Sequence, residues 1–182
     1  MHPSVIEFLK AHLTAEEVAG KRVVEIGSQD VNGTPRPIVL PLKPAAYIGV
    51  DCAPVAGVDV VADAKTLTAQ FGESSFEIVI STEMLEHVED WRPIVEQLKA
   101  LVKPEGLLLI TTRSPGFPYH PYPIDVWRYT LPDFHKIFKD MEIMAICSDW
   151  QVPGVFIKAR KPAQFVSCDL SRIEVGKVTP TF

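Results

Sequence analysis

Short, nearly continuous apolar runs alternate along this chain with segments in which apolar residues recur every three or four positions. Runs of the first kind are typical of buried strands, and segments of the second kind are typical of helices that cover a sheet. The pattern predicts strands at residues 22–26, 46–50, 58–61, 76–80, 107–112, 143–147 and 155–159. It predicts helices at residues 5–13, 65–71, 94–102 and 130–138. Ser4 and Thr130 are the expected N-caps of the first and last helix.

Strands that alternate with helices favour a sheet whose crossover helices cover it. We therefore predict an α/β fold of the Rossmann-like, doubly wound class, with a mainly parallel sheet of about seven strands and helices on both faces. Prolines between residues 28 and 44 argue against a long helix there. Residues 1–161 form the predicted domain, and residues 162–182 form a C-terminal tail to which the pattern assigns no element.

Three predicted strands end at residues suited to ligand binding, which in open parallel sheets takes place beyond the carboxyl ends of the strands. Gly27 lets the backbone approach a ligand. Asp51, 24 positions later, has the spacing of a carboxylate that holds ribose hydroxyls, and Asp63 offers another acceptor. Glycine fingerprints for phosphate are absent. The combination indicates a ligand with ribose and adenine but no pyrophosphate, although an aspartate at a strand end is also a common turn residue.

A series of short motifs follows these strands in order. They are Val-Val-Glu-Ile-Gly at 23–27, Tyr-Ile-Gly-Val-Asp at 47–51, Val-Val-Ala-Asp-Ala at 60–64 and Phe-Glu-Ile-Val-Ile at 76–80. Ser-Thr-Glu-Met-Leu-Glu-His-Val follows at 81–88, and Pro-Glu-Gly at 104–106 precedes the fifth strand. The series resembles class I S-adenosylmethionine-dependent methyltransferases of the small, single-domain, type 11-like kind. The resemblance covers residues 20–112 well and the remainder more loosely.

The resemblance implies S-adenosylmethionine as the cofactor and methyl transfer as the activity. Glu25, Gly27 and Ser28 would line the methionine part of the cofactor. Asp51 would accept hydrogen bonds from the ribose hydroxyls.

The resemblance also assigns the adenine and sulfonium ends. Asp63 would face the adenine amino group with the Ala64 amide nearby, and Glu83 would lie close to the methionine moiety and the sulfonium. Residues 28–32 separate Gly27 from the next glycine, whereas the family spaces its glycines more closely. This departure keeps an alternative open, in which a degenerate methyltransferase fold serves as a non-catalytic binding or scaffold module. A nicotinamide-dependent oxidoreductase is a third possibility, but it requires a pyrophosphate loop that the sequence lacks.

Two histidines are the predicted catalytic residues. A general base helps when the acceptor is a hydroxyl or an amine, and the imidazole pKa is close to neutrality. His87 comes just after the fourth predicted strand, and His120 lies in the loop beyond the fifth. A structural role suits His87 equally well, because the family carries this histidine whatever the acceptor.

A dense group of functional side chains follows the fifth predicted strand. Residues 120–129 read His-Pro-Tyr-Pro-Ile-Asp-Val-Trp-Arg-Tyr, at the edge where an acceptor would enter. A similar Asp-x-Trp-Arg-Tyr run occurs in methyltransferases associated with sugar or polysaccharide pathways, so the resemblance implies a small polar acceptor, of which a sugar-related molecule is one example. Tyr122, Asp125 and Arg128 are the predicted substrate contacts. The alternative is a packed lid in which Asp125 and Arg128 pair with each other.

Composition limits the expected binding partners and the expected cellular location. The net charge is −5 and no basic stripe is present, which argues against nucleic acid as the main partner. No apolar run approaches the roughly 20 residues of a membrane helix, and no signal peptide opens the chain. We therefore expect a cytoplasmic protein with a small-molecule substrate, and the oligomeric state is left open. Cys52, Cys147 and Cys168 form no metal motif, so no metal is predicted.

Overall fold

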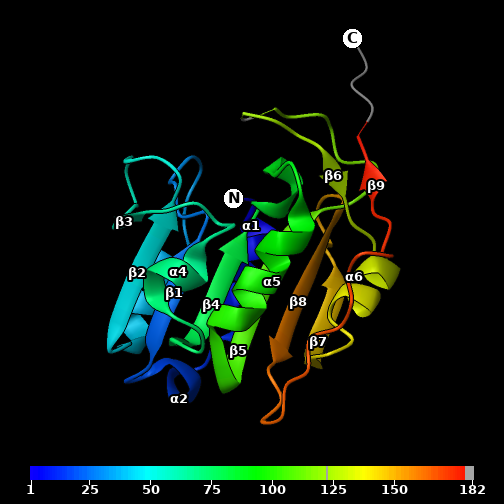
Figure 1. Ribbon diagram of the computed structural model, residues 1–182. Helices are drawn as coiled ribbons and strands as arrows, with labels where there is room; N and C mark the ends of the chain where they lie inside the picture. Colours follow the sequence, from blue (N-terminus) through cyan, green and yellow to red (C-terminus); the bar gives the residue numbers. More distant parts are fainter. Residues whose placement is uncertain (122, 179–182) are drawn as a thin grey trace.

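A seven-stranded sheet forms the centre of the molecule (Figure 1). The computed structural model describes residues 1–121 and 123–178. From one edge of the sheet to the other, the strands are β3 (Val60–Val61), β2 (Ala46–Asp51), β1 (Arg22–Ile26), β4 (Phe76–Thr82), β5 (Val102–Arg113), β8 (Gly154–Arg160) and β7 (Glu142–Ser148). The first five run parallel to one another, whereas β8 is antiparallel to both β5 and β7. The prediction of a mainly parallel sheet is confirmed.

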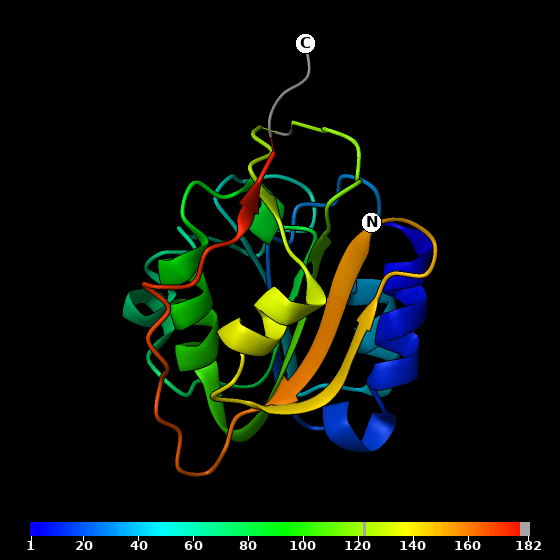
Figure 2. The same ribbon diagram turned by 90° about the vertical axis from the view of Figure 1, so that its right-hand side faces the viewer.

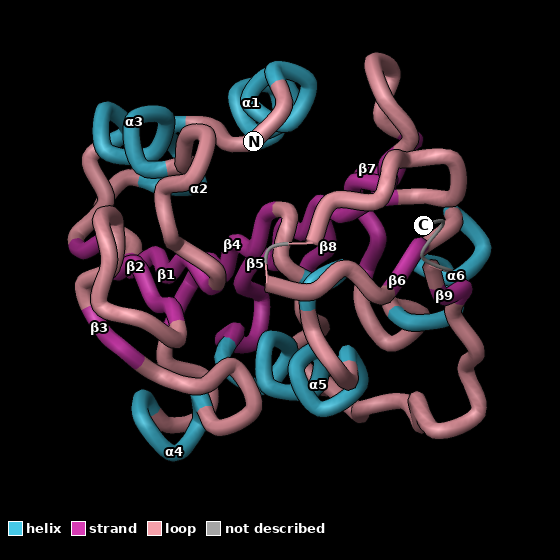
Figure 3. The backbone as a smooth tube through the Cα atoms, turned by 90° about the horizontal axis from the view of Figure 1, so that it is seen from above, coloured by secondary structure: helices cyan, strands magenta, loops and turns pink. Residues whose placement is uncertain are grey.

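Helices cover both faces of the sheet, as the view from above shows (Figure 3). One face carries α1 (Pro3–His12), α2 (Ala15–Val18) and α3 (Arg36–Val39). The other carries α4 (Leu67–Phe71), α5 (Trp91–Leu101) and α6 (Leu131–Ile137). Each set of helices meets the sheet in its own apolar cluster. The predicted α/β class, doubly wound and Rossmann-like, is therefore confirmed.

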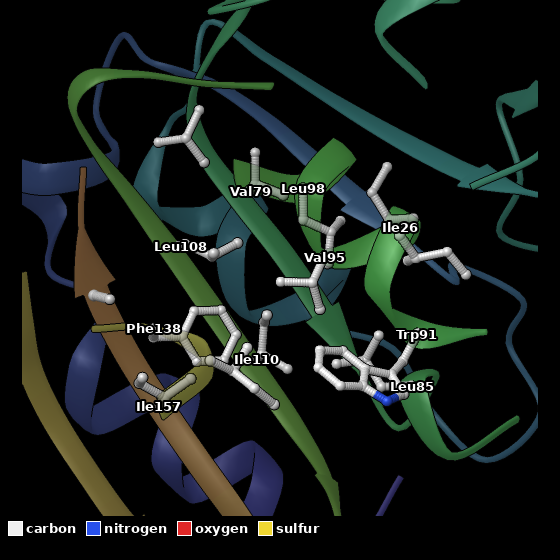
Figure 4. Close-up of a cluster of buried hydrophobic side chains, with 14 of the residues drawn as sticks. Ile26, Val79, Leu85, Trp91, Val95, Leu98, Leu108, Ile110, Phe138 and Ile157 are labelled. Atoms are coloured by element: carbon white, nitrogen blue, oxygen red, sulfur yellow. The ribbon is translucent and has the colours of Figure 1, made fainter. Parts of the chain in front are cut away.

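The apolar cluster on the α5 side, part of which is drawn in Figure 4, includes Ile26 and Val50, which directly precede the predicted site residues Gly27 and Asp51. Each fully buried side chain of this kind contributes about 1.5–3 kcal/mol relative to exposure. Trp91 at the start of α5 is completely buried, and its ring meets that of Tyr129 edge to face at 6.3 Å. The labelled members of the cluster are Ile26, Val79, Leu85, Trp91, Val95, Leu98, Leu108, Ile110, Phe138 and Ile157.

One of the two predicted helix caps is correct. Thr130 caps α6: its hydroxyl accepts from the Asp133 amide at 3.3 Å, and the Asp133 carboxylate accepts from the Thr130 amide at 2.9 Å. Ser4, in contrast, lies inside α1 and not at its N-cap, which is His2. The Ser4 hydroxyl instead donates to Asp149 Oδ2 at 2.9 Å. The side chain therefore makes a tertiary contact and does not cap the helix.

Two elements differ in extent from the pattern. The proline-rich segment contains only the short helix α3 and a 3₁₀ turn, Leu40–Leu42, among its described elements, as expected from the argument against a long helix. In both, a proline occupies an opening position. Strand β5 begins at Val102 and not at residue 107, because Val102 already pairs with Phe76. A register shift between Phe76 and Ile78 accommodates the Pro-Glu-Gly sequence within the strand.

The C-terminal tail returns across the α5 side of the domain (Figure 2). Leu170 and Ile173 are buried members of the α5-side cluster. Arg92 of α5 donates from Nε to the Leu170 carbonyl at 3.2 Å and from Nη2 to the Ile173 carbonyl at 2.6 Å. Strand β9 (Gly176–Lys177) then pairs with β6 (Trp127–Arg128). The tail thereby contacts the loop that the sequence assigns to the acceptor.

Candidate functional site

A cavity of about 1090 Å³ opens at the carboxyl ends of β1, β2 and β4. These strand ends face the viewer in Figure 3. The loop after β5 and the start of α1 complete the cavity wall. The predicted site residues in that wall are Glu25, Gly27, Asp51, Asp63, Ala64, Glu83, His87 and His120.

The other predicted site residues do not line this cavity or cannot be placed. Ser28 is fully buried and its Oγ lies beside Gly49 of β2, where a Cβ added to that glycine would approach it to 2.8 Å. Asp125 and Arg128 are buried and bind each other, with Nη1–Oδ1 at 2.5 Å and Nη2–Oδ2 at 2.7 Å. This is the internal pair of the packed-lid alternative. Tyr122 lies outside the described residues.

Asp51 is held at the end of β2 with both oxygens oriented. Its Oδ2 accepts from the Gln29 amide at 3.0 Å, and its Oδ1 accepts from the Cys52 amide at 2.7 Å. A carboxylate oxygen has more than one acceptor position, so each can take a further hydrogen bond from a ligand in the cavity. Gly27 lies opposite with φ of +83°, and a Cβ there would come within 2.9 Å of Met84 Cβ. Both its conformation and its packing require glycine.

Glu25 lies in the cavity wall but is almost fully shielded from solvent. Thr34 Oγ1 donates to its carboxylate at 3.0 Å, and Tyr47 Oη donates to Oε2 at 2.5 Å. Burial raises the pKa of Glu25 to about 7, although these two donors act in the opposite direction. Neither residue was identified from the sequence: the contact of Thr34 depends on the fold of the proline-rich segment, and that of Tyr47 depends on the pairing of β2 with β1.

Arg113, at the end of β5, is a cavity residue that the sequence analysis missed. Its guanidinium is fully buried and forms ion pairs with Glu83 and with Asp149, the latter at 3.1 Å. Burial lowers its pKa, and the Asp149 carboxylate counteracts this. Glu83 also accepts from Thr111 Oγ1 at 3.1 Å and has a left-handed backbone with φ of 55°. The only signal for Arg113 in the sequence was that it directly follows a predicted apolar strand.

The two predicted catalytic histidines lie together although 33 positions separate them. His87 ends a 3₁₀ turn, Leu85–His87, and its ring meets that of His120 edge to face at 4.8 Å. Asp125 Oδ2 accepts from the His120 amide at 2.8 Å and lies 3.0 Å from its Nδ1. The Asp125–Arg128 pair therefore holds the loop that presents His120. Burial lowers the pKa of His120, and Asp125 opposes this effect.

Comparison with known proteins assigns the family. The model of a family described as a methyltransferase domain matches residues 4–148. The chain belongs to this methyltransferase family. No curated protein matches it in sequence.

Several solved structures share the fold of the chain. An S-adenosylmethionine-dependent methyltransferase from Mesorhizobium loti is 17% identical to this methyltransferase, with a TM-score of 0.64 over 87% of this chain and 98% of that one. A Burkholderia thailandensis 1,6-didemethyltoxoflavin-N1-methyltransferase, solved with that compound and S-adenosylhomocysteine, is 14% identical, with a TM-score of 0.66 over 86% and 78%. The cyclase SpnF is also 14% identical, with a TM-score of 0.68 over 88% and 81%.

The enzyme uses S-adenosylmethionine as its cofactor, and the cavity suits that molecule. Oriented carboxylates at the ends of β1, β2 and β4 offer acceptors for an amino group and for hydroxyls, and no phosphate-binding glycine loop competes for the site. When bound, the cofactor supplies a methyl group on a sulfonium, already activated for transfer. No helix in the described parts of the methyltransferase is long and apolar enough to cross a membrane.

Proposed function

We propose that this methyltransferase methylates a small polar acceptor bound between the cofactor site and the loop of residues 113–130. The observation that carries the proposal is the arrangement of the cavity, in which carboxylates on β-strand ends form one wall and His87 and His120 form another. Its volume of about 1090 Å³ slightly exceeds the roughly 300–1,000 Å³ typical of small-molecule sites, which leaves room for a second ligand.

The proposed cofactor contacts follow the strand ends. Asp51 accepts from the ribose hydroxyls, and Asp63 with the Ala64 amide receives the adenine. Glu25, Gly27 and Glu83 line the methionine part. The support for Asp51 is that each of its oxygens is already oriented by one backbone amide. Ser28 leaves the proposal, because its side chain is fully buried beside Gly49 of β2.

The proposed acceptor contacts are His87 and His120. Their imidazoles place nitrogen atoms at the cavity wall and assist the loss of the acceptor's proton. Asp125 and Arg128 act through the loop and not through direct contact, since both are buried and paired. A hydroxyl-rich acceptor, of which a sugar derivative is one example, suits two imidazoles better than an apolar one does.

The alternative function is a non-catalytic binding module on the same fold. The long spacing between Gly27 and Gly33 favours it, and the similarity to the cyclase SpnF shows that this fold also occurs in a protein named for a different reaction. Further proposals are a cytoplasmic location and no role in nucleic-acid binding; a net charge of −5 supports the latter.

The test is formation of S-adenosylhomocysteine from S-adenosylmethionine in the presence of a panel of hydroxyl, amine and carboxyl compounds. Product and methylated acceptor should appear together by mass spectrometry. His87→Ala and His120→Ala should lower the rate while cofactor binding is kept. Tight cofactor binding with no transfer to any member of a broad panel would favour the binding module.

A further inference from the structure

Glu86 is a buried carboxylate that the proposed methyl transfer does not use. The side chain is completely inaccessible to solvent. Its Oε2 accepts from Thr112 Oγ1 at 2.8 Å, whereas its Oε1 has no hydrogen-bond partner among the described residues. A buried carboxylate oxygen without a donor or a cation is costly, because nothing replaces the water that it lost. A cation bound beside Oε1 would supply the missing partner.

His87 supplies a free nitrogen next to that oxygen. Its Nδ1 lies 2.5 Å from the Ile124 carbonyl, which requires the ring proton on Nδ1 and leaves the lone pair on Nε2. That Nε2 lies 4.0 Å from Glu86 Oε1, which is too far for a hydrogen bond but close enough for one atom to lie between them. The ring is thus oriented for binding through Nε2.

His120, whose ring meets that of His87, has the same arrangement. Its Nδ1 lies 3.1 Å from the Pro118 carbonyl and 3.0 Å from Asp125 Oδ2, and the other ring nitrogen has no hydrogen-bond partner among the described residues. Histidines that bind metals almost always donate the second ring N–H to a backbone carbonyl or a carboxylate. Both histidines here have such acceptors.

We propose that Glu86, His87 and His120 bind one divalent transition-metal ion at the acceptor side of the cavity. The three residues each offer a ligand atom, and these atoms lie within 4.8 Å of one another. Two imidazoles and one carboxylate suit Zn²⁺, Fe²⁺, Co²⁺ or Ni²⁺ better than Mg²⁺ or Ca²⁺, which prefer oxygen ligands. The cysteines, on which the sequence prediction of no metal rested, are not involved.

Ion binding requires only a small rearrangement. Metal–ligand distances of about 2.0–2.2 Å place neighbouring ligand atoms roughly 3–3.5 Å apart, so the groups must approach by about 1 Å. His120 can make this movement, because its side chain is 36% exposed and lies on a loop. Three protein ligands leave at least one coordination position open, as in catalytic metal sites.

The open position deepens the proposed function, on which this part of the inference rests. A hydroxyl oxygen of the acceptor bound to the ion loses its proton to solvent more readily, because the ion stabilises the resulting anion. That oxygen then forms the bond to the methyl carbon while the bond from carbon to sulfur breaks. In the ion-bound protein, His87 and His120 are therefore ligands and not direct proton acceptors.

Titration with Co²⁺ tests the site without any knowledge of the acceptor. The full chain, freed of metal with a chelator, should bind one Co²⁺ and develop visible absorption bands of a nitrogen- and oxygen-ligated ion. Glu86→Gln and His120→Ala should each weaken binding by about 100-fold or more, since removal of a ligand costs at least as much as loss of its supporting hydrogen bonds. His135→Ala, an exposed histidine on α6, is the matched control and should bind as the unaltered chain does.

Titration with S-adenosylhomocysteine on the same samples shows whether each variant retains the folded cofactor site. If Co²⁺ does not bind with one-to-one saturation, or if Glu86→Gln and His120→Ala bind it as well as His135→Ala does, the metal site is refuted. Co²⁺ binding without methyl transfer to any acceptor would instead keep the metal site and contradict the proposed function.

Discussion

The cofactor half and the acceptor half of the cavity are built in different ways. In the cofactor half, the functional residues lie at or just beyond the ends of buried strands, and backbone amides orient the Asp51 carboxylate. In the acceptor half, segments far apart in the sequence contact one another: the rings of His87 and His120 meet, and the tail pairs with β6. The cofactor half therefore depends on the sheet, whereas the acceptor half depends on tertiary contacts that a single substitution can remove.

The largest effect is expected where the two halves meet, at Arg113. This residue forms ion pairs with Glu83 in the cofactor half and with Asp149, and its guanidinium lies 4.6 Å from the ring centre of Phe117 in the acceptor loop. Arg113→Met leaves buried carboxylates without their partner and should lower the free energy of unfolding by about 3–5 kcal/mol. Equilibrium unfolding in urea measures this change in free energy. The control Lys103→Met removes a partly exposed pair with Glu77 and should cost about 1 kcal/mol or less.

The next effect concerns the buried carboxylate of the cofactor half. The pKa of Glu25 is about 7 in the folded protein against an ordinary 4.5. The folded state therefore holds a proton that the unfolded state releases, so stability is fully present below pH 4.5 and is lost as the pH rises to about 7. The loss should amount to about 3 kcal/mol. The free energy of unfolding, measured at several pH values across this range, should change less with pH for Glu25→Gln than for the unaltered chain. The same pH dependence in the two proteins would refute the raised pKa.

Asp51→Ala tests whether ligand binding in the two halves of the cavity is independent. It should weaken binding of S-adenosylhomocysteine by about 1–3 kcal/mol, because ligand hydroxyls lose their acceptor, and it should leave Co²⁺ binding unchanged. Isothermal titration of both ligands measures the two effects. Asp169→Ala, at an exposed position of the tail, is the control and should change neither. Equal affinity for S-adenosylhomocysteine in Asp51→Ala would remove Asp51 from the cofactor site.

The smallest effect is expected at the contact between α5 and the tail. Arg92→Ala removes two hydrogen bonds to tail carbonyls and should lower stability by about 1–2 kcal/mol. It should raise hydrogen exchange in the tail and in β6, while S-adenosylhomocysteine affinity stays unchanged. Exchange that rises equally at β1 and β2 would contradict the independence of the two halves.

The same contrast explains what the sequence could predict. The prediction of residues 22–26 as a strand matches β1 residue for residue, because a strand covered on both faces is mostly apolar, as Val23, Val24 and Ile26 are here. Gly27 and Asp51 follow from such runs and were found with them. Arg113 and Glu86 were missed, since their importance comes from Asp149 and Thr112, which only the folded chain brings near.

Local rules also failed where tertiary contacts compete with them. Ser4 has the residue type of a helix cap, yet Asp149 takes its hydroxyl. The tail has no apolar periodicity long enough for an element, but Leu170 and Ile173 are individually buried in the core. Asp125 and Arg128 have the chemistry of substrate contacts, and their spacing of three residues equally allows the pair that the structure contains.

The most direct test of the central claim is thermal unfolding of the full chain with S-adenosylmethionine, S-adenosylhomocysteine and NAD in separate samples. A ligand at one hundred times its dissociation constant should stabilise the folded state by about 2.7 kcal/mol. For a domain of this size the midpoint should rise by roughly 5–11 °C with the two sulfur compounds and stay unchanged with NAD. An unchanged midpoint at saturating concentrations of both sulfur compounds would contradict the assignment of this cavity to the cofactor.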